Sequence, residues 1–112
     1  MPIYSKEVGN VLVVYFTDSR LMDESKIRET GLQLLALIDK CPNKRILLNF
    51  KNVVFLTSTM IGNVILLNRE CKSSNVDLRL CDVSPGILQV FLTMRLDKLL
   101  NIQLTELTAF QP

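Results

Sequence analysis

The segment from Arg45 to Phe50 constrains the fold more than any other part of this chain, because Ile46, Leu47 and Leu48 follow one another without an intervening polar residue. A strand with one face in water alternates apolar and polar side chains, whereas a central strand covered on both faces does not. The run therefore predicts a buried central strand and helices that pack on its sheet.

The segment before this strand has the spacing of an amphipathic helix. Its apolar stripe consists of Ile27, Gly31, Leu34, Leu35 and Ile38. Asp23 or Ser25 can cap the start of this helix, and Pro42 stops it.

Two more helices are predicted after the strand. The segment Val53 to Leu56 leads into Thr57, Ser58 and Thr59, where a helix begins that runs to about Ser74. Its core stripe consists of Met60, Val64, Leu67 and Cys71, flanked by Ile61 and Ile65. Its opposite face carries Thr59, Gly62, Asn63, Leu66 and Glu70. A third helix runs from Pro85, after the cap Ser84, to about Thr93.

The remaining strands complete an α/β pattern. Ile3 to Val8 and Val11 to Phe16 form an antiparallel hairpin around Gly9 and Asn10, while Asp77 to Cys81 and Ile102 to Leu104 are short strands. The tail to Pro112 is a weak helix or coil. The order predicts one α/β domain over residues 1–112, a mixed sheet of four to five strands with parallel central strands, and three to four helices packed on it.

Composition excludes several classes of function. The 112 residues include no His, so the commonest general base and metal ligand are absent, and Cys41, Cys71 and Cys81 are too scattered for a metal site. We expect no metal, cofactor or catalytic residue. The net charge of +2 and the lack of a basic block argue against nucleic acid. No membrane span or secretory signal is visible, so we expect a cytoplasmic protein that neither enters a membrane nor binds nucleic acid.

The three hydroxyl residues Thr57, Ser58 and Thr59 have two interpretations. They stand where a strand ends and a helix begins, a place where backbone N–H groups favour negative charge. Simple helix capping is the other interpretation, and capping statistics alone favour it, because Ser and Thr are ordinary caps.

Here the sequence resembles a known family. The stretch from Ile46 to Gly62, with Phe55-Leu56-Thr57-Ser58-Thr59-Met60-Ile61-Gly62 at its end, resembles the motif Phe-Ile-Asp-Ser-Ser-Gly-Leu-Gly of STAS domains, the anti-sigma factor antagonists. Val83 to Leu92, followed by Leu96 to Leu100, is similar to the segment after the family's fourth strand. Arg20 to Asp23 is close to the Gly-Glu-Leu-Asp that precedes its first helix.

The resemblance implies a STAS fold and a partner-switching function in bacteria. In this family the unphosphorylated domain binds an anti-sigma factor, often a Ser/Thr kinase, and so controls sigma-factor-dependent transcription. Phosphorylation of the motif's first serine reverses the binding. That serine corresponds to Ser58, with Thr57 and Thr59 as alternative sites. The expected partner surface consists of Asp23, Thr57, Ser58, Thr59, Gly62, Asn63 and Leu66.

The motif also departs from the family pattern. Thr57 replaces its Asp, Thr59 its second Ser, Met60 its first Gly, and Arg95 a later Gly. Met60 is either core, as its position in the stripe favours, or part of an apolar docking patch with Leu66.

The altered motif leaves two other hypotheses. The chain could be a STAS scaffold or assembly subunit of a stress-signalling complex that is not phosphorylated. A small enzyme would depend on a cysteine or a hydroxyl of the triplet with no His to activate it, so we expect no enzyme. The sequence predicts no oligomeric state.

Overall fold

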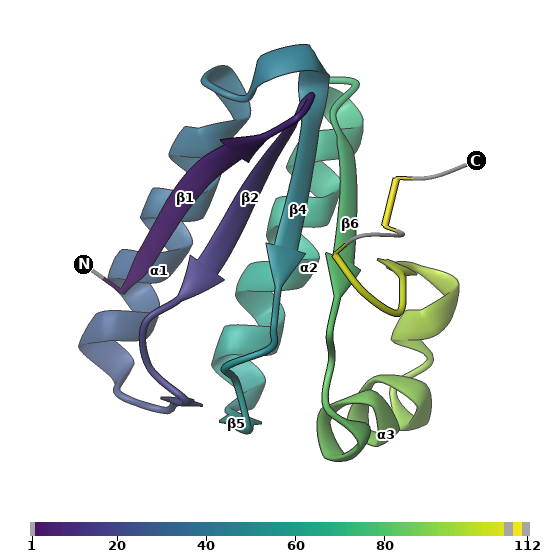
Figure 1. The fold of residues 1–112 in the computed structure, drawn as a ribbon. Coiled ribbons are helices and arrows are strands. Elements are labelled where there is room, and N and C mark those ends of the chain that lie inside the picture. The colour runs from purple at the N-terminus through teal and green to yellow at the C-terminus, as the bar shows by residue number, and fades with distance from the viewer. Residues whose placement is uncertain (1, 107–108, 111–112) are drawn as a thin grey trace.

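The computed structural model describes residues 2–106 and 109–110, and a five-stranded mixed sheet forms its centre (Figure 1). The strands are β1 (Ile3–Val8), β2 (Val11–Phe16), β4 (Arg45–Asn49), β6 (Asp77–Cys81) and β7 (Asn101–Ile102). They lie in the order β1-β2-β4-β6-β7. Only the β1–β2 hairpin is antiparallel, and every other neighbouring pair is parallel. The mixed sheet with parallel central strands is therefore confirmed.

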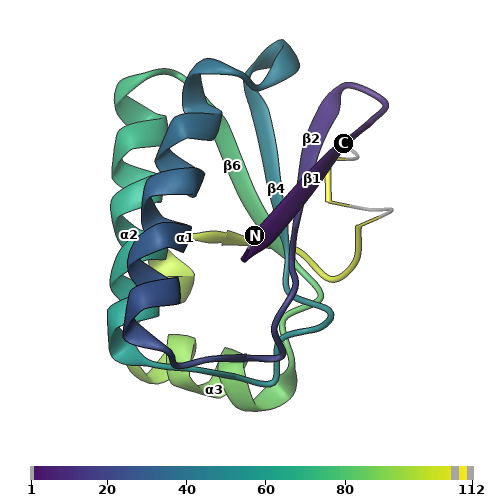
Figure 2. The same ribbon diagram turned by 90° about the vertical axis from the view of Figure 1, so that its left-hand side faces the viewer.

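Two long helices cover one face of this sheet. α1 (Glu24–Ala36) and α2 (Ser58–Ser73) lie side by side and both start at the same end of the molecule (Figures 1 and 2). α3 (Pro85–Thr93) lies at that end as well. The short 3-10 turns are η1 (Leu37–Asp39), η2 (Pro42–Lys44) and η3 (Leu96–Lys98). Asp23, Thr57 and Ser84 cap the three helices through their side chains. The structure thus confirms Ser84 and selects Asp23 over Ser25 and Thr57 from the hydroxyl triplet.

The main core lies between the sheet and the two long helices. Ile46 and Leu48 of β4 face α1 and α2 and are fully buried. Phe16, Phe50 and Phe91 add a chain of aromatic contacts, with ring centroids 5.0 Å and 6.5 Å apart, that ties α3 to the sheet. α2 thus buries the core stripe that predicted it, including Met60, whose side chain has no exposed surface.

The second face of the sheet is covered differently from our expectation. Leu47 lies there in a smaller cluster with Val13, Cys81 and Ala109, and no helix packs on it among the described residues. Ala109 is part of this cluster, and Phe110 packs against it. β4 is therefore buried on both faces, as its unbroken apolar run predicts, but helices account for only one of them.

Other differences are small. β7 begins one residue earlier than the predicted strand and is shorter. In α1, Thr30 is buried, while Gly31, Leu35 and Ile38 of the predicted stripe are half-buried. Part of the predicted tail, residues 107–108 and 111–112, lies outside the described residues.

Candidate functional site

A second, two-stranded sheet brings the starts of α1 and α2 together. β3 (Arg20–Leu21) and β5 (Phe55–Leu56) pair in parallel, with Leu21 opposite Leu56. The backbone N–H of Thr57 then donates to the carbonyl of Leu21 at 3.1 Å. Each strand runs almost directly into its helix, so the caps Asp23 and Thr57 lie at the same end of the molecule.

Asp23 is exposed, and its carboxylate holds the start of α1. Its Oδ1 accepts hydrogen bonds from the backbone N–H groups of Ser25 at 3.0 Å and Lys26 at 3.1 Å, and from the Ser25 hydroxyl at 2.8 Å. The hydrogen bond from the Ser25 side chain and that from the Lys26 backbone lower the pKa of Asp23. The carboxylate is therefore ionised at neutral pH and stays fixed beside the β3–β5 sheet.

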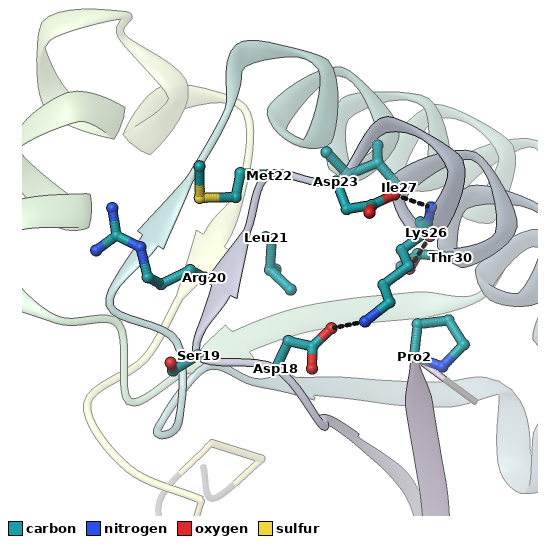
Figure 3. Close-up of a pocket in the computed structure, with 10 residues that line it drawn as sticks. All are labelled: Pro2, Asp18, Ser19, Arg20, Leu21, Met22, Asp23, Lys26, Ile27 and Thr30. Atoms are coloured by element: carbon teal, nitrogen blue, oxygen red, sulfur yellow. Dashed lines mark hydrogen bonds and ion pairs between the residues drawn. The ribbon is translucent and has the colours of Figure 1, made fainter.

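A cavity of about 330 Å³ adjoins Asp23 at the start of α1 (Figure 3). Lys26 and Asp18 form an ion pair at 3.4 Å beside it. Figure 3 shows Arg20 and Met22 pointing away from this ion pair. Because the Lys26 ammonium is already paired with a carboxylate, Arg20 is the unpaired cation among the described residues that line this cavity.

The three hydroxyl residues differ in accessibility. Thr57 is half-buried, and its Oγ1 accepts a long hydrogen bond of 3.4 Å from the Met60 N–H as the cap of α2. Ser58 and Thr59, the first two residues of the helix, are exposed. The structure therefore offers two accessible hydroxyls and assigns the third to capping.

The rest of the predicted surface is divided between solvent and the helix contact. Gly62 is exposed, and no atom lies within 4 Å of where its Cβ would be. Leu66 is half-buried. Asn63 lies against α1, where its Nδ2 donates to the carbonyl of Ile27 at 2.8 Å, so this side chain holds the two helices together.

Sequence reasoning missed an apolar groove that is lined in part by Leu56 and Ile61, on either side of the hydroxyl triplet in the sequence. It has a volume of about 240 Å³, lies between β5 and α3, and is lined by Val54, Phe55, Leu56, Ile61, Gly86, Ile87 and Val90. Val54 is 61% exposed, and the Arg20 guanidinium lies 5.0 Å from the centre of the Phe55 ring. The signal available in the sequence was the run Val53 to Leu56, which is too apolar for a loop that only connects two elements.

The acidic and cysteine side chains of the described residues are scattered over the domain. These residues contain no group of three or more Cys, Asp or Glu residues placed to hold a metal ion. Burial raises the pKa of Cys71 to about 12 and raises that of Cys81 as well, so neither thiol is a ready nucleophile. In the same part of the chain, every helix is too short or too polar to cross a membrane. What this end of the molecule presents is exposed hydroxyls, one fixed carboxylate and an apolar groove.

Solved structures of the same fold are known. The chain is similar to an anti-sigma-factor antagonist (STAS) domain protein from Planctomyces limnophilus, with 22% identity, a TM-score of 0.81, and coverage of 96% of this chain and 92% of that one. It is also similar to TM1081 from Thermotoga maritima, with 17% identity, a TM-score of 0.85, and coverage of 97% and 92%.

A third relative is the anti-sigma factor antagonist SpoIIAA, a Bacillus cell fate determinant. Its unphosphorylated form has 20% identity, a TM-score of 0.74, and coverage of 96% of this chain and 92% of that one. The values for its phosphorylated form are 20%, 0.71, 96% and 95%. At these identities the likeness shows the fold, which is the one that the sequence resemblance implied.

A comparison with curated proteins finds no match to the chain. The model of the STAS domain matches residues 5–109, nearly the whole sequence. This chain therefore belongs to the STAS domain family.

Proposed function

We propose that this single-domain protein is an anti-sigma factor antagonist that acts in the bacterial cytoplasm and binds an anti-sigma factor or Ser/Thr kinase of the partner-switching type. The observation that carries the proposal is the exposed Ser58, which lies at the same end of the molecule as Asp23. In the sequence it stands between Leu56 and Ile61, two residues that line the apolar groove. Interfaces of this kind combine an apolar centre with a few polar groups at its rim. The surface would serve for docking, and no chemical step on a substrate is assigned to it.

Ser58 is the site we propose for phosphorylation. The Thr57 hydroxyl is engaged as a cap and half-buried, whereas Ser58 is exposed in the first turn of α2. A phosphate there adds about −1.5 to −2 charge, which the N-terminus of a helix tolerates. The domain would stay folded, while a docked partner would meet a bulky dianion at the edge of an apolar contact.

The experiment that tests phosphorylation uses the partner kinase and mass spectrometry. We expect modification of the wild-type chain at Ser58, a loss of modification in Ser58→Ala, and no loss in Thr59→Ala. Modification that persists in Ser58→Ala, or that Thr59→Ala abolishes, would assign the site to another hydroxyl.

Partner binding is tested with matched charge changes at the two ends of α2. Ser58→Glu should weaken binding at least ten-fold, whereas Ser73→Glu, at the other end of the same helix, should leave it unchanged. The groove has its own pair of variants on α3. Val90→Asp places a charge in the groove and should weaken partner binding. The control is Leu92→Asp, at a position that is equally exposed but outside the groove, and it should leave partner binding unchanged.

One observation favours a second candidate, a STAS scaffold or assembly subunit that is not phosphorylated. Thr57 stands where the family motif has Asp, so the carboxylate beside the acceptor serine is missing. If the scaffold hypothesis holds, Ser58→Glu leaves partner binding unchanged while Val90→Asp still weakens it.

A further inference from the structure

A further cavity lies on the face of the sheet opposite α1 and α2, and no residue of the expected partner surface lines it. Its volume is about 700 Å³, within the range of about 300–1,000 Å³ that small-molecule sites span. It opens at the carboxyl ends of the parallel strands β2 and β4 and is lined mainly by Tyr4, Tyr15, Asn49, Lys51 and Asn52. In α/β sheets this end of the parallel strands is where ligands bind.

Two aromatic rings form one wall of this cavity. Tyr4 and Tyr15 are opposite each other on β1 and β2, and their rings stack with centroids 5.0 Å apart and planes 18° apart. Tyr4 is 55% exposed, so this ring offers surface to a further planar group. Stacking on an exposed aromatic ring is how proteins hold planar ligands with little dependence on their substituents.

Hydrogen bonds within the protein hold the Tyr15, Asn49 and Asn52 side chains of the cavity in place. The Tyr15 hydroxyl donates to Glu106 Oε1 at 2.7 Å, and Asn49 Nδ2 donates to the same oxygen at 2.9 Å. Asn49 Oδ1 accepts from the backbone N–H of Lys51 at 2.8 Å. Asn52 Nδ2 lies 3.3 Å from the carbonyl of Phe16. Ligand binding therefore needs little ordering of these side chains, which favours affinity.

The charge of the cavity selects the kind of ligand. The Lys51 ammonium forms no ion pair with any described residue, and Lys6 Nζ lies 5.3 Å from the centre of the Tyr15 ring. Glu106 is the acidic group next to the cavity, and its Oε1 already accepts two hydrogen bonds. A cation without an ion pair and an exposed ring that line the same cavity suit a molecule that carries both a planar ring and a negative charge.

We propose that this cavity binds a small aromatic anion, whose ring stacks on Tyr4 and whose anionic group pairs with Lys51. The site lies on a different face from the partner surface, and its existence does not depend on the function proposed above. The anionic group can be a phosphate or a carboxylate, since Lys binds either as a point charge.

The test titrates the full chain with probe compounds and follows backbone and tyrosine NMR signals. 1-Naphthyl phosphate and 1-naphthoate carry both recognition elements, cyclohexyl phosphate carries only the charge, and 2-naphthol carries only the ring. We expect shifts confined to the cavity, and binding of at least one naphthyl anion about five-fold or more tighter than that of the two single-element compounds, a factor that corresponds to about 1 kcal/mol. The better of the two naphthyl anions identifies the preferred anionic group.

Variants at exposed positions test the assigned roles without threatening the fold. Tyr4→Leu and Lys51→Gln should each weaken the preferred probe about five-fold or more, while Lys72→Gln, an exposed lysine on α2, should change nothing. Weakening by Lys51→Gln should disappear at high salt, because an exposed ion pair is screened. The proposal is overturned if neither naphthyl anion shifts the cavity signals at millimolar concentration, if cyclohexyl phosphate or 2-naphthol binds as tightly, or if Tyr4→Leu has no effect.

Discussion

The contact between Gly31 and Asn63 allows a sharp prediction about how α1 and α2 are held together. A Cβ at Gly31 would lie 2.8 Å from Asn63 Oδ1 and 3.0 Å from its Cγ, closer than real Cβ contacts come. The Asn63 amide cannot simply turn away, because its Nδ2 donates to the Ile27 carbonyl at 2.8 Å. Gly31→Ala must therefore displace this amide and break its hydrogen bond.

The change in the free energy of unfolding follows from one stabilising and two destabilising contributions. Ala is favoured over Gly inside a helix by about 1 kcal/mol. Loss of the Asn63 hydrogen bond costs about 1 kcal/mol, and forcing an extra methyl into a packed contact costs about 1–3 kcal/mol. The net expectation is a loss of about 1–3 kcal/mol, or roughly 4 °C in Tm for each kcal/mol in a domain of this size.

Urea unfolding followed by far-UV circular dichroism measures this change, since the chain has no Trp to report by fluorescence. The control is a double-mutant cycle with Asn63→Ala, which removes the obstructing amide. In that background Gly31→Ala should stabilise the protein by about 1 kcal/mol, so the sign of the effect reverses. If Gly31→Ala stabilises the wild-type chain, the packing role assigned to Asn63 is wrong.

Three further predictions concern the reactivity of the three cysteines, the Asp23 cap and the left-handed backbone conformation of Arg95. Iodoacetamide at pH 8 should modify the half-exposed Cys41 first and leave Cys71 and Cys81 intact until urea unfolds the chain, because burial raises the pKa of these two thiols. Peptide mass spectrometry measures the modification of each cysteine. Modification of all three at equal rates would contradict the burial of Cys71 and Cys81. Because folding lowers the pKa of Asp23, its contribution to stability is present above the unfolded value of about 3.9 and is lost as the pH falls through the lowered value. Asp23→Asn, an equally good cap, should therefore flatten the fall of Tm below about pH 4, whereas Asp23→Ala should lower Tm at neutral pH too. An unchanged acid profile in Asp23→Asn would be the contrary result. Arg95 replaces a family glycine and has φ of 59°, a left-handed conformation that glycine adopts without steric cost. Arg95→Gly should therefore raise the free energy of unfolding in urea by about 0.5–1 kcal/mol. A lower free energy of unfolding would show that the Arg95 side chain contributes more than its backbone conformation costs.

The elements with a clear period were predictable from sequence. The stripe of α2 from Met60 to Cys71 is buried as predicted, and the cap residues Asp23, Thr57 and Ser84 perform the roles that their chemistry suggests. These features are local, since periodicity and capping depend on residues within a few positions of one another.

The features that sequence reasoning missed depend on contacts between distant segments. β3 and β5 have only two residues each, too few to show a period, and they pair because α1 and α2 bring their leading segments together. The cover on the second sheet face is equally non-local. There the Arg79 Nη1 donates to the Ala109 carbonyl at 2.8 Å, and its guanidinium lies 4.3 Å from the centre of the Phe110 ring.

Asn63 shows that a helix position can have a contact that one helix alone does not reveal. On α2 it falls on the polar side of the stripe, which suggested a partner surface. Its half-buried place against Gly31 becomes visible only when α1 is packed alongside. A glycine inside the apolar stripe of α1 was the available sign that something approaches that helix closely.

Thr57 separates two roles that a single Asp fills in the family motif. A carboxylate at that position would cap α2 and also place a negative charge beside the acceptor serine. Thr57 keeps the first role, because its Oγ1 accepts from the Met60 N–H, and lacks the second, because a hydroxyl carries no charge. The departure from the motif therefore does not weaken the inference of fold, since Thr is a good cap. It bears only on the proposed recognition of Ser58 by a kinase, and the comparison of Ser58→Glu with Val90→Asp separates that question from partner docking.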